Sequence, residues 1–318
     1  MSTVPEPGTI REAAERIAPY IHRTPLLHCS GIDRLCGCSI LFKCENLQKA
    51  GAFKSRGAVN AVFSLNAEKE NRGVCTHSSG NHAAALSRAA ALRKMPAYIV
   101  MPENSNPVKI AAVKEYGGQI TFCKPSLKDR ETSLETVKEK TGASEIHPYN
   151  DVRIIAGQAT AALEIFQDTA QPDILMAPVG GGGLLSGTAL SAHYFSSGTQ
   201  VIAAEPKAAD DAARSFHSRT FVPSDNPQTI ADGLLTSLGS LTYPLILKHV
   251  HDILTVEEDT IVTAMKTIWE RMKLVVEPSS AVPLAAVLEN PGHFKGRHVI
   301  IILSGGNADL MKLPWMTR

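Results

Sequence analysis

Four short segments of the chain carry groups that are suited to catalysis or ligand binding. The first is the run from Gly51 to Ala58, in which Lys54 follows an aromatic residue and stands just ahead of a predicted helix. An amine that is partly withdrawn from water loses its proton more readily and becomes a nucleophile toward carbonyl groups. Taken alone, however, Lys54 is better explained as an ordinary surface lysine, because lysine is rarely buried.

The second segment consists of Gly180, Gly181, Gly182 and Gly183, directly after the apolar run 174–179. Backbone N–H groups of such a loop can converge on an anion at the start of a helix. The spacing matches neither a P-loop nor a dinucleotide-binding fingerprint. Four adjacent glycines cost backbone entropy, which favours an anion cradle over a simple turn.

The third and fourth segments also follow predicted strands. They are the run Ser78, Ser79, Gly80, Asn81 and His82, and the run from Ser304 to Asn307. Hydroxyl, amide and N–H donors at a helix start suit a carboxylate, although plain helix capping explains the first run equally well. The second run is either a turn or a hydroxyl at the carboxyl end of a strand, where open α/β folds bind ligands.

The joint occurrence of these segments is more informative than any one of them. An amine, an anion cradle, a carboxylate-binding loop and a terminal hydroxyl are what a pyridoxal phosphate site that processes amino acids needs.

The elements that must position these groups alternate between short apolar strands and longer amphipathic helices, which predicts an α/β fold with parallel sheets. The predicted strands are 39–44, 73–77, 97–101, 119–123, 174–179, 201–204 and 299–303. The predicted helices are 81–92, 107–116, 128–140, 155–168 and 261–273, and residues 214–229 are expected to form an irregular loop. We expect residues 68–148 to form a small domain, and residues 1–67 and 149–318 a larger one, with a ligand-binding cleft between them.

Composition excludes several classes of protein. The 318 residues have a formal net charge of +1, which disfavours nucleic-acid binding. No apolar run approaches the roughly 20 residues that cross a bilayer, and residues 1–17 lack the apolar core of a secretory signal, so a cytoplasmic location is expected. The six cysteines show neither a disulfide framework nor a zinc-site spacing, and most are expected to be small buried side chains.

From about residue 8 to residue 311, the chain resembles the fold-type II pyridoxal-phosphate enzymes, whose fold is like that of the tryptophan synthase β subunit. The similarity lies in the serine racemase and serine/threonine dehydratase group, and it is greatest to the eukaryotic-type serine racemases. The motifs that carry it are residues 24–26, 45–48, 53–58, 78–82, 180–183, 204–206, 231–233, 277–278 and 304–307.

The resemblance implies a role for each motif. Lys54 would hold pyridoxal phosphate as a Schiff base, Phe53 would pack beside its ring, and Asn81 would bond its 3-hydroxyl group. Residues 180–183 would bind the phosphate and Ser304 the pyridine nitrogen. The substrate would be bound by Ser78, Ser79, Gly80, Asn81, His82, Asp232 and Glu277.

The resemblance also implies the reaction. Lys54 would take the α-proton on one face, and Ser79 would act on the opposite face, as racemisation requires. Many dehydratases of the group carry alanine at this second position. The expected activity is therefore serine racemisation with elimination of serine to pyruvate and ammonia. The alternatives are an ammonia-lyase for L-threonine and L-serine or for threo-3-hydroxyaspartate, and, more remotely, a non-catalytic binding protein with this fold.

Further partners follow from the same resemblance. Glu205, Asp211 and the carbonyl group of Ala209 would bind Mg²⁺, or Ca²⁺ or Mn²⁺, although a solvated acidic turn is the ordinary explanation of such residues. Lys49 falls at one position of a nucleotide site that would accept ATP as an activator. A homodimer acting on a small amino acid is expected, without nucleic acid or membrane as a partner.

Overall fold

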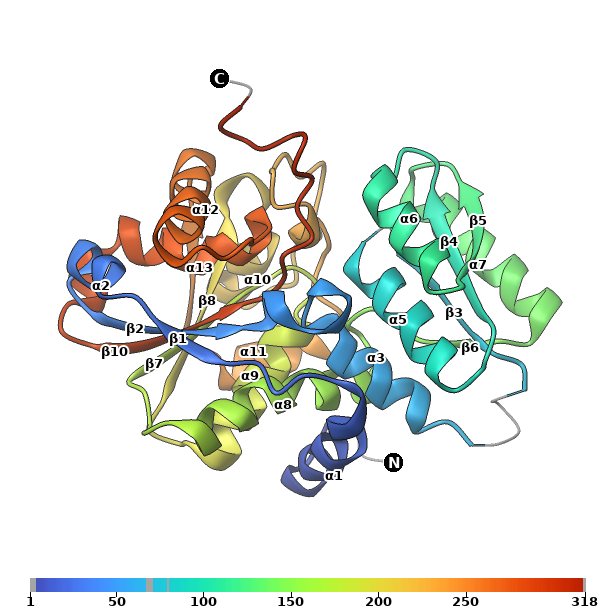
Figure 1. Ribbon diagram of the computed structural model, residues 1–318, viewed down its shortest axis with the longest axis horizontal. Coiled ribbons are helices and arrows are strands. Elements are labelled where there is room, and N and C mark those ends of the chain that lie inside the picture. Colours follow the sequence, from blue (N-terminus) through green and yellow to red (C-terminus); the bar gives the residue numbers. More distant parts are fainter. Residues whose placement is uncertain (1–3, 67–70, 79, 317–318) are drawn as a thin grey trace.

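The computed structural model describes residues 4–66, 71–78 and 80–316, and it contains two sheets (Figure 1). The larger sheet has the order β1-β2-β10-β7-β8-β9, and all its pairs are parallel except β1 with β2. Its strands are β1 (Leu26–His28), β2 (Ser39–Cys44), β7 (Ile174–Pro178), β8 (Gln200–Pro206), β9 (Asp252–Val256) and β10 (His298–Leu303). The parallel arrangement confirms the predicted α/β class.

Helices cover both faces of the larger sheet, which explains why its central strands are apolar almost throughout. One face packs against α12 (Glu258–Met272) and α13 (Pro278–Glu289), and the other against α9 (Gly183–Phe195) and α11 (Thr242–His249). The remaining helices of this lobe are α1 (Pro7–Ile17), α2 (Ser30–Cys36), α8 (Val152–Asp168), α10 (Asp211–Ser218) and α14 (Pro291–Phe294).

The smaller sheet has the order β5-β4-β3-β6 and is parallel throughout. Its strands are β3 (Val74–His77), β4 (Ala97–Pro102), β5 (Gln119–Cys123) and β6 (Ser144–Glu145). Successive residues of β4 face opposite sides, so that Ile99 packs toward α5 (Asn81–Leu92) and Val100 toward α7 (Leu127–Thr141). Helix α6 (Pro107–Glu115) also belongs to this lobe.

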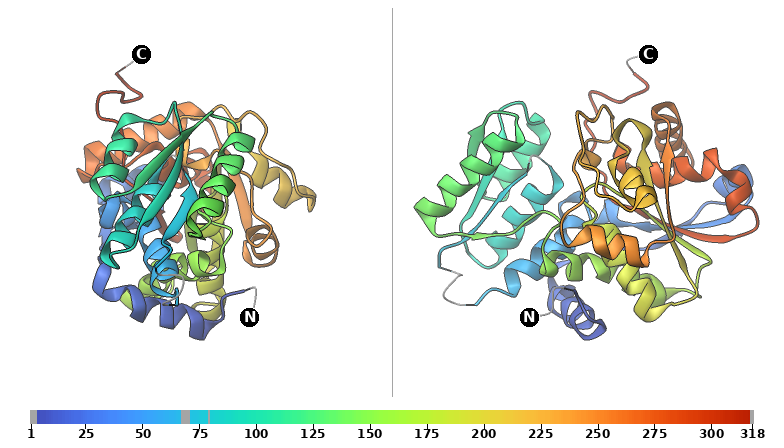
Figure 2. Two further views of the ribbon diagram at one scale, coloured as in Figure 1. Left: turned by 90° about the vertical axis from the view of Figure 1, so that its right-hand side faces the viewer. Right: turned by 180° about the vertical axis from the view of Figure 1, so that it is seen from behind.

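The two lobes lie side by side and are connected through α3 (Lys54–Phe63), as the views from the side and from behind also show (Figure 2). Buried residues of α3 pack in one apolar cluster with α5 and β4. The same helix contacts α8 of the larger lobe. The helix that begins at Lys54 therefore stands at the junction of the two sheets.

Some expectations need correction. The segment 214–229 is not irregular throughout, because α10 extends to Ser218. Strands β1, β6 and β9 were not predicted, because β1 and β6 are only three and two residues long and β9 lies at the edge of its sheet with only two of its five residues buried. All six cysteines are free and five are buried, and burial raises the pKa of the Cys44 and Cys75 thiols to about 12. No helix within the described residues is long and apolar enough to cross a membrane.

Candidate active site

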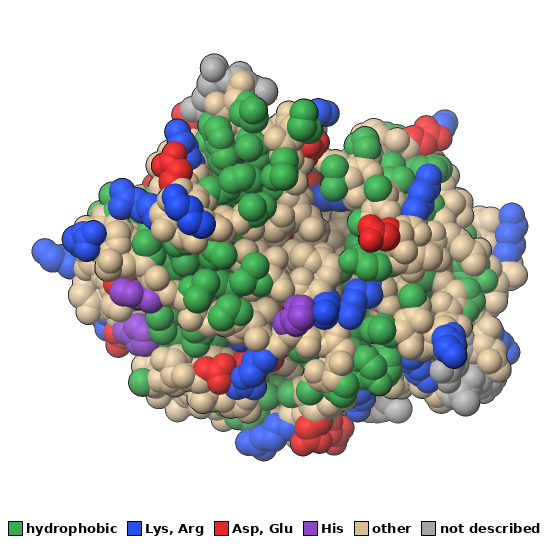
Figure 3. Space-filling view, in the orientation of Figure 1, with side chains coloured by type: hydrophobic (Ala, Val, Ile, Leu, Met, Phe, Trp, Pro, Cys, Tyr) green, Lys and Arg blue, Asp and Glu red, His purple; other side chains and the backbone are tan. Residues whose placement is uncertain are grey.

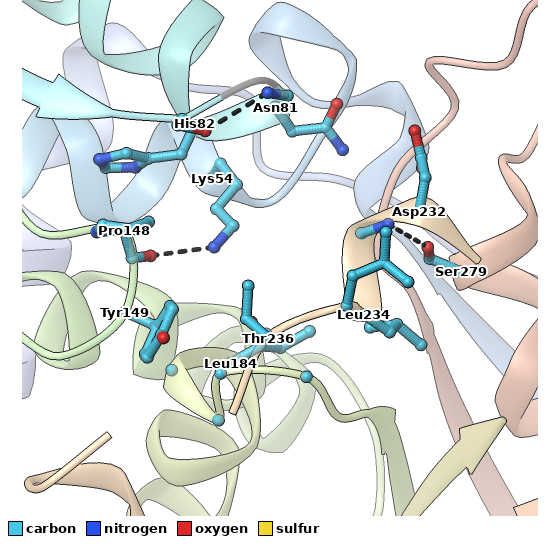
Figure 4. A pocket seen from close by; sticks show the side chains of 18 of the residues that line it. Lys54, Asn81, His82, Pro148, Tyr149, Leu184, Asp232, Leu234, Thr236 and Ser279 are labelled. Atoms are coloured by element: carbon cyan, nitrogen blue, oxygen red, sulfur yellow. Dashed lines mark hydrogen bonds between the residues drawn. The ribbon is translucent and has the colours of Figure 1, made fainter. Parts of the chain in front are cut away.

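A cavity of about 440 Å³ lies between the two sheets, and residues from both lobes line it (Figure 4). The carboxyl ends of parallel strands open toward the same edge of a sheet. The runs that follow β3, β7 and β10 accordingly meet at this cavity. Its lining includes Ser78, the four glycines and Ser304. The surface is visibly hollowed between the lobes (Figure 3).

Lys54 begins α3 and projects into the cavity (Figure 4). The preceding turn is fixed to the run after β10, because Phe53 N–H donates to the Ser304 carbonyl group at 3.0 Å. The amine donates to the carbonyl oxygen of Pro148 at 2.9 Å. Burial lowers the pKa of Lys54 to about 8, and the attraction of Glu277 only partly opposes this shift. The explanation of Lys54 as a surface residue is therefore wrong.

The tetraglycine loop joins β7 to α9 and leaves no room for side chains. A Cβ atom on Gly181 would lie 2.3 Å from the ring of Tyr149, and one on Gly180 would lie 2.9 Å from the Cα atom of Leu234. Gly182 has φ of +86°, a conformation that glycine adopts without strain. Among the described residues, none accepts a hydrogen bond from the N–H groups of residues 181–183. These donors, at the start of α9, are free to bind an anion.

The run after β3 leads into α5 at the opposite wall. Ser79 lies outside the described residues. Gly80 N–H donates to the Ser78 hydroxyl group at 3.3 Å, and both residues line the cavity. His82 is buried, its Nε2 atom lies 3.0 Å from the Ile146 carbonyl oxygen, and burial lowers its pKa to about 3. A neutral His82 therefore supports the loop and carries no charge for a substrate carboxylate.

The side chains of Asp232 and Glu277 line the cavity in different surroundings. Asp232 forms an ion pair with Lys109 of α6, which joins the two lobes across the cavity. Glu277 precedes α13 and is almost fully buried. Its pKa is raised to about 7, mainly by burial and to a smaller extent by the negative charge of Asp232. Its Oε1 atom accepts from Asn81 Nδ2 at 2.7 Å, whereas Oε2 has no partner within the described part of the chain.

Ser304 is the first residue after β10. It is 3% exposed, its hydroxyl oxygen lies 3.1 Å from that of Ser280, and it reaches the cavity. Phe53 lines the cavity as well, next to Lys54. A hydroxyl group at this place can donate one hydrogen bond and accept others, but it carries no charge at neutral pH.

Sequence reasoning missed two cations of the cavity, Lys109 and Arg130. Arg130 lies in the first turns of α7, and its buried Nε atom has no hydrogen-bond partner among the described residues. Lys109 belongs to no recognisable motif, and Arg130 stands in the charged run of residues 128–131, a pattern that is typical of a solvated helix. Only the packing of α7 against β3 and β4 brings this guanidinium group to the cavity.

The residues expected to bind a cation lie together outside the cavity lining. Glu205, at the end of β8, accepts from Ala212 N–H and Ala213 N–H at 3.1 and 2.8 Å, and burial raises its pKa to about 9. Asp211 is 1% exposed, neither of its oxygens has a partner among the described residues, and burial raises its pKa to about 6. Such an unpaired buried carboxylate fits a cation. Ala209 ends the short turn between them.

The described residues contain no group of three His, Cys, Asp or Glu side chains placed to share a metal ion. A cation here would thus need a carbonyl oxygen or waters in addition to the two carboxylates. Lys49 lies in the turn before Lys54 and is half-buried, and the structure does not bring it to the cavity lining.

Comparisons with known proteins agree with this geometry. A family model described as "Pyridoxal-phosphate dependent enzyme" matches residues 17–305. A protein named beta-hydroxyaspartate dehydratase from Paracoccus denitrificans is 50% identical, over 95% of this chain and 96% of its own length. A serine racemase from Arabidopsis thaliana is 48% identical, over 96% of this chain and 94% of its own. The crystal structure of serine racemase from Dictyostelium discoideum superposes with a TM-score of 0.92 at 47% identity, covering 97% of this chain and 100% of the other.

Proposed function

Because the chain belongs to the family of pyridoxal-phosphate-dependent enzymes, we propose that it interconverts L- and D-serine and also eliminates serine to pyruvate and ammonia. The observation that carries this proposal is the partly buried amine of Lys54, which shares one cavity with a glycine loop whose N–H groups at residues 181–183 have no acceptor among the described residues. This pairing supplies both anchors of the cofactor, one for its aldehyde and one for its phosphate.

The cofactor would be held by residues of both lobes. Lys54 would form the covalent bond, Phe53 would pack beside the ring, and residues 180–183 would donate to the phosphate. Asn81 would donate to the 3-hydroxyl oxygen and Ser304 would bond the pyridine nitrogen. The bound cofactor supplies an electron sink that makes the α-proton of an attached amino acid acidic.

Proton movement is the task of this chain's own side chains. The Lys54 amine has a lowered pKa, so a large fraction is unprotonated near pH 8 and can accept the α-proton. Racemisation also needs a group on the opposite face, and we assign this role to Ser79. Ser78, Gly80 and the start of α5 would bind the substrate carboxylate, while Asp232 and Glu277 form the facing wall.

A second candidate is elimination from threo-3-hydroxyaspartate, and Arg130 is the observation that favours it. This cation lies in the cavity wall, its buried Nε atom has no partner among the described residues, and it would match a second substrate carboxylate. The relative from Paracoccus denitrificans bears a name of this kind. Elimination from L-threonine without racemisation is a further variant of the same chemistry, whereas a non-catalytic binding protein is disfavoured by the intact Lys54.

Further parts of the proposal concern activators and assembly. We place Mg²⁺, or Ca²⁺ or Mn²⁺, at Asp211 and Glu205 with the Ala209 carbonyl group, supported by the unpaired buried oxygens of Asp211. ATP near Lys49 and a homodimer rest on the family resemblance. For the homodimer, hydrophobic side chains gathered on the larger lobe give some support (Figure 3).

The experiment uses purified protein with pyridoxal phosphate and Mg²⁺, and separately after chelation. L-Serine, L-threonine and threo-3-hydroxyaspartate are supplied in turn, keto acid is measured, and D-serine is quantified by chiral chromatography. For Ser79→Ala we expect loss of D-serine formation with elimination retained, because only the second face loses its proton-transfer group. D-Serine formation at the wild-type rate in this variant would contradict the assignment.

Arg130→Met separates the two candidates in the same assay. If the second carboxylate binds Arg130, kcat/KM for threo-3-hydroxyaspartate should fall by about 10- to 100-fold, the value of one hydrogen bond to a charged group. The value for L-serine should change much less. Faster turnover of threo-3-hydroxyaspartate than of L-serine by the wild type would make the second candidate the better one.

A further inference from the structure

The side-chain amide of Asn81 is held by two residues that come from distant parts of the chain. Its Nδ2 atom donates to Glu277 Oε1 at 2.7 Å, and its Oδ1 atom accepts from Asn307 Nδ2 at 2.9 Å. Asn81 begins α5 of the smaller lobe, whereas Glu277 precedes α13 and Asn307 follows β10 in the larger lobe. The amide is thus fixed at both ends across the cavity.

The partners determine which end of the amide is nitrogen. If the amide were reversed, its oxygen would face the Glu277 carboxylate and its nitrogen would face the donating Nδ2 of Asn307, and both contacts would be repulsive. Asn307 cannot turn to suit it, because the same Nδ2 atom also donates to the Ala50 carbonyl oxygen at 2.9 Å. The side chain of Asn307 also packs tightly on Gly51, where a Cβ atom would lie 2.3 Å from its Oδ1.

Glu277 is equally constrained. Its backbone N–H donates to the Gly305 carbonyl group at 3.0 Å, and its Oε1 atom lies so close to Gly305 that a Cβ atom there would be 2.4 Å away. The Asn81 nitrogen carries two hydrogens, of which one is used by Oε1. The second remains available to a ligand in the cavity that Asn81 lines (Figure 4).

We propose that Glu277 and Asn307 are positioning residues that hold the Asn81 amide with its second N–H directed at the 3-hydroxyl oxygen of bound pyridoxal phosphate. This inference rests on the proposed function, which assigns Asn81 to that oxygen. A fixed donor stabilises the oxygen in its anionic form, so the two residues set the protonation state of the cofactor without touching it. Glu277 thereby has a role beyond that of a cavity wall.

The test measures the absorption spectrum of the bound cofactor between pH 6 and 10. Asn307→Asp replaces the donor that faces Asn81 Oδ1 by an acceptor, so that neither orientation of the Asn81 amide suits both partners and its second N–H is no longer held in place. We expect the pH of the spectral transition to rise by about one to two units, the equivalent of one lost hydrogen bond to a charged group. Asn307→Ala should shift it in the same direction by less. Glu277→Gln keeps an acceptor oxygen for Asn81, so the upward shift of the transition should be smaller than in Asn307→Asp.

Asn46→Asp is the matched control, because Asn46 packs against Gly306 of the same turn and donates to the Val275 carbonyl group instead of to Asn81. The spectral transition of the cofactor bound to Asn46→Asp should remain at the wild-type pH. An equal shift in this control, or no shift in either Asn307 variant, would overturn the inference. If the wild type acquires no visible band with pyridoxal phosphate, the proposed function itself fails. If Asn307→Asp does not fold, the test compares the pH of the spectral transition in Asn307→Ala with that in the control.

Discussion

Burial and a neighbouring carboxylate act in opposite directions on the amine of Lys54. Loss of water disfavours the charged form, whereas Glu277 favours it, and burial has the larger effect because the pKa falls to about 8. Glu277 is itself close to neutral, with a pKa raised to about 7, which weakens its pull at and below that pH. The two shifts together leave a reactive amine at a pH where an exposed lysine would be almost fully protonated.

We predict that capture of the cofactor follows this shifted pKa. When apoprotein is mixed with pyridoxal phosphate, the rate at which the visible band forms should rise about tenfold per pH unit below pH 8 and level off above it. Only the unprotonated amine attacks the aldehyde, which gives this sign. Stopped-flow absorbance from pH 6 to 10.5 measures it, with Lys54→Arg as a control that forms no band. A rate that keeps rising up to pH 10 would show that burial does not act on Lys54 as described.

Beneath Lys54, a buried charge cluster connects β2, α3 and α8. Arg56 bonds Glu45 with two nitrogens at 2.7 Å each and Glu164 with two at 2.8 Å, and Lys43 donates to Glu164 at 2.6 Å. Two cations thus balance two carboxylates. The Arg56–Glu45 pair closes the base of residues 46–55, which include Lys54 at the start of α3. The cluster therefore sets where α3 begins relative to the sheet.

Removal of the Arg56 guanidinium group should be costly. We expect Arg56→Met to lower the free energy of unfolding by about 3–5 kcal/mol, because two buried carboxylates would be left with Lys43 alone. Arg56→Lys should recover part of this loss, since it restores the charge but not the bidentate geometry. Urea denaturation followed by circular dichroism measures both variants.

Arg23→Met provides the comparison, because Arg23 pairs with Asp168 at the end of α8 with 53% of its side chain exposed. This variant should cost no more than about 1 kcal/mol. Similar losses for Arg56→Met and Arg23→Met would show that burial of the cluster is unimportant for stability.

At the scale of the whole molecule, polar contacts between described residues join the two lobes at the cavity. Lys109 of α6 pairs with Asp232 of the larger lobe, and the amide of Asn81 bonds Glu277 and Asn307. The Lys109 side chain is 11% exposed and that of Asp232 is 49% exposed, so the ion pair is open to water on one side. A pair of this exposure contributes no more than about 1 kcal/mol to the contact between the lobes.

We predict that Lys109→Met raises KM for the amino-acid substrate about fivefold with a smaller effect on kcat. A loss of about 1 kcal/mol lowers the population of the arrangement that binds substrate. Steady-state kinetics measures it, and added salt should raise the wild-type KM in the same direction. Lys207→Met, which removes the exposed pair with Glu257 inside one lobe, should leave KM unchanged. Equal effects of the two substitutions would exclude a role for the contact between lobes.

The sequence by itself determined the chemistry and the class of fold. Apolar runs predicted strands close to β2, β7 and β10, because strands that are buried on both sides must be apolar at nearly every position. The motifs after these strands predicted the glycine loop and the place of Ser304, because such local patterns depend on few neighbours. They could not reveal the burial of Lys54 or the orientation of the Asn81 amide.

Only the tertiary structure decided those features and the places of Lys109 and Arg130. Each depends on contacts between residues that are far apart in the chain, such as Lys54 with Pro148 or Asn81 with Asn307. A pKa or an amide orientation reflects the atoms around a group, and those atoms come from several elements. The residues adjacent in the sequence do not indicate which distant residues will surround a group. The packing of the two sheets around one cavity determines these neighbours.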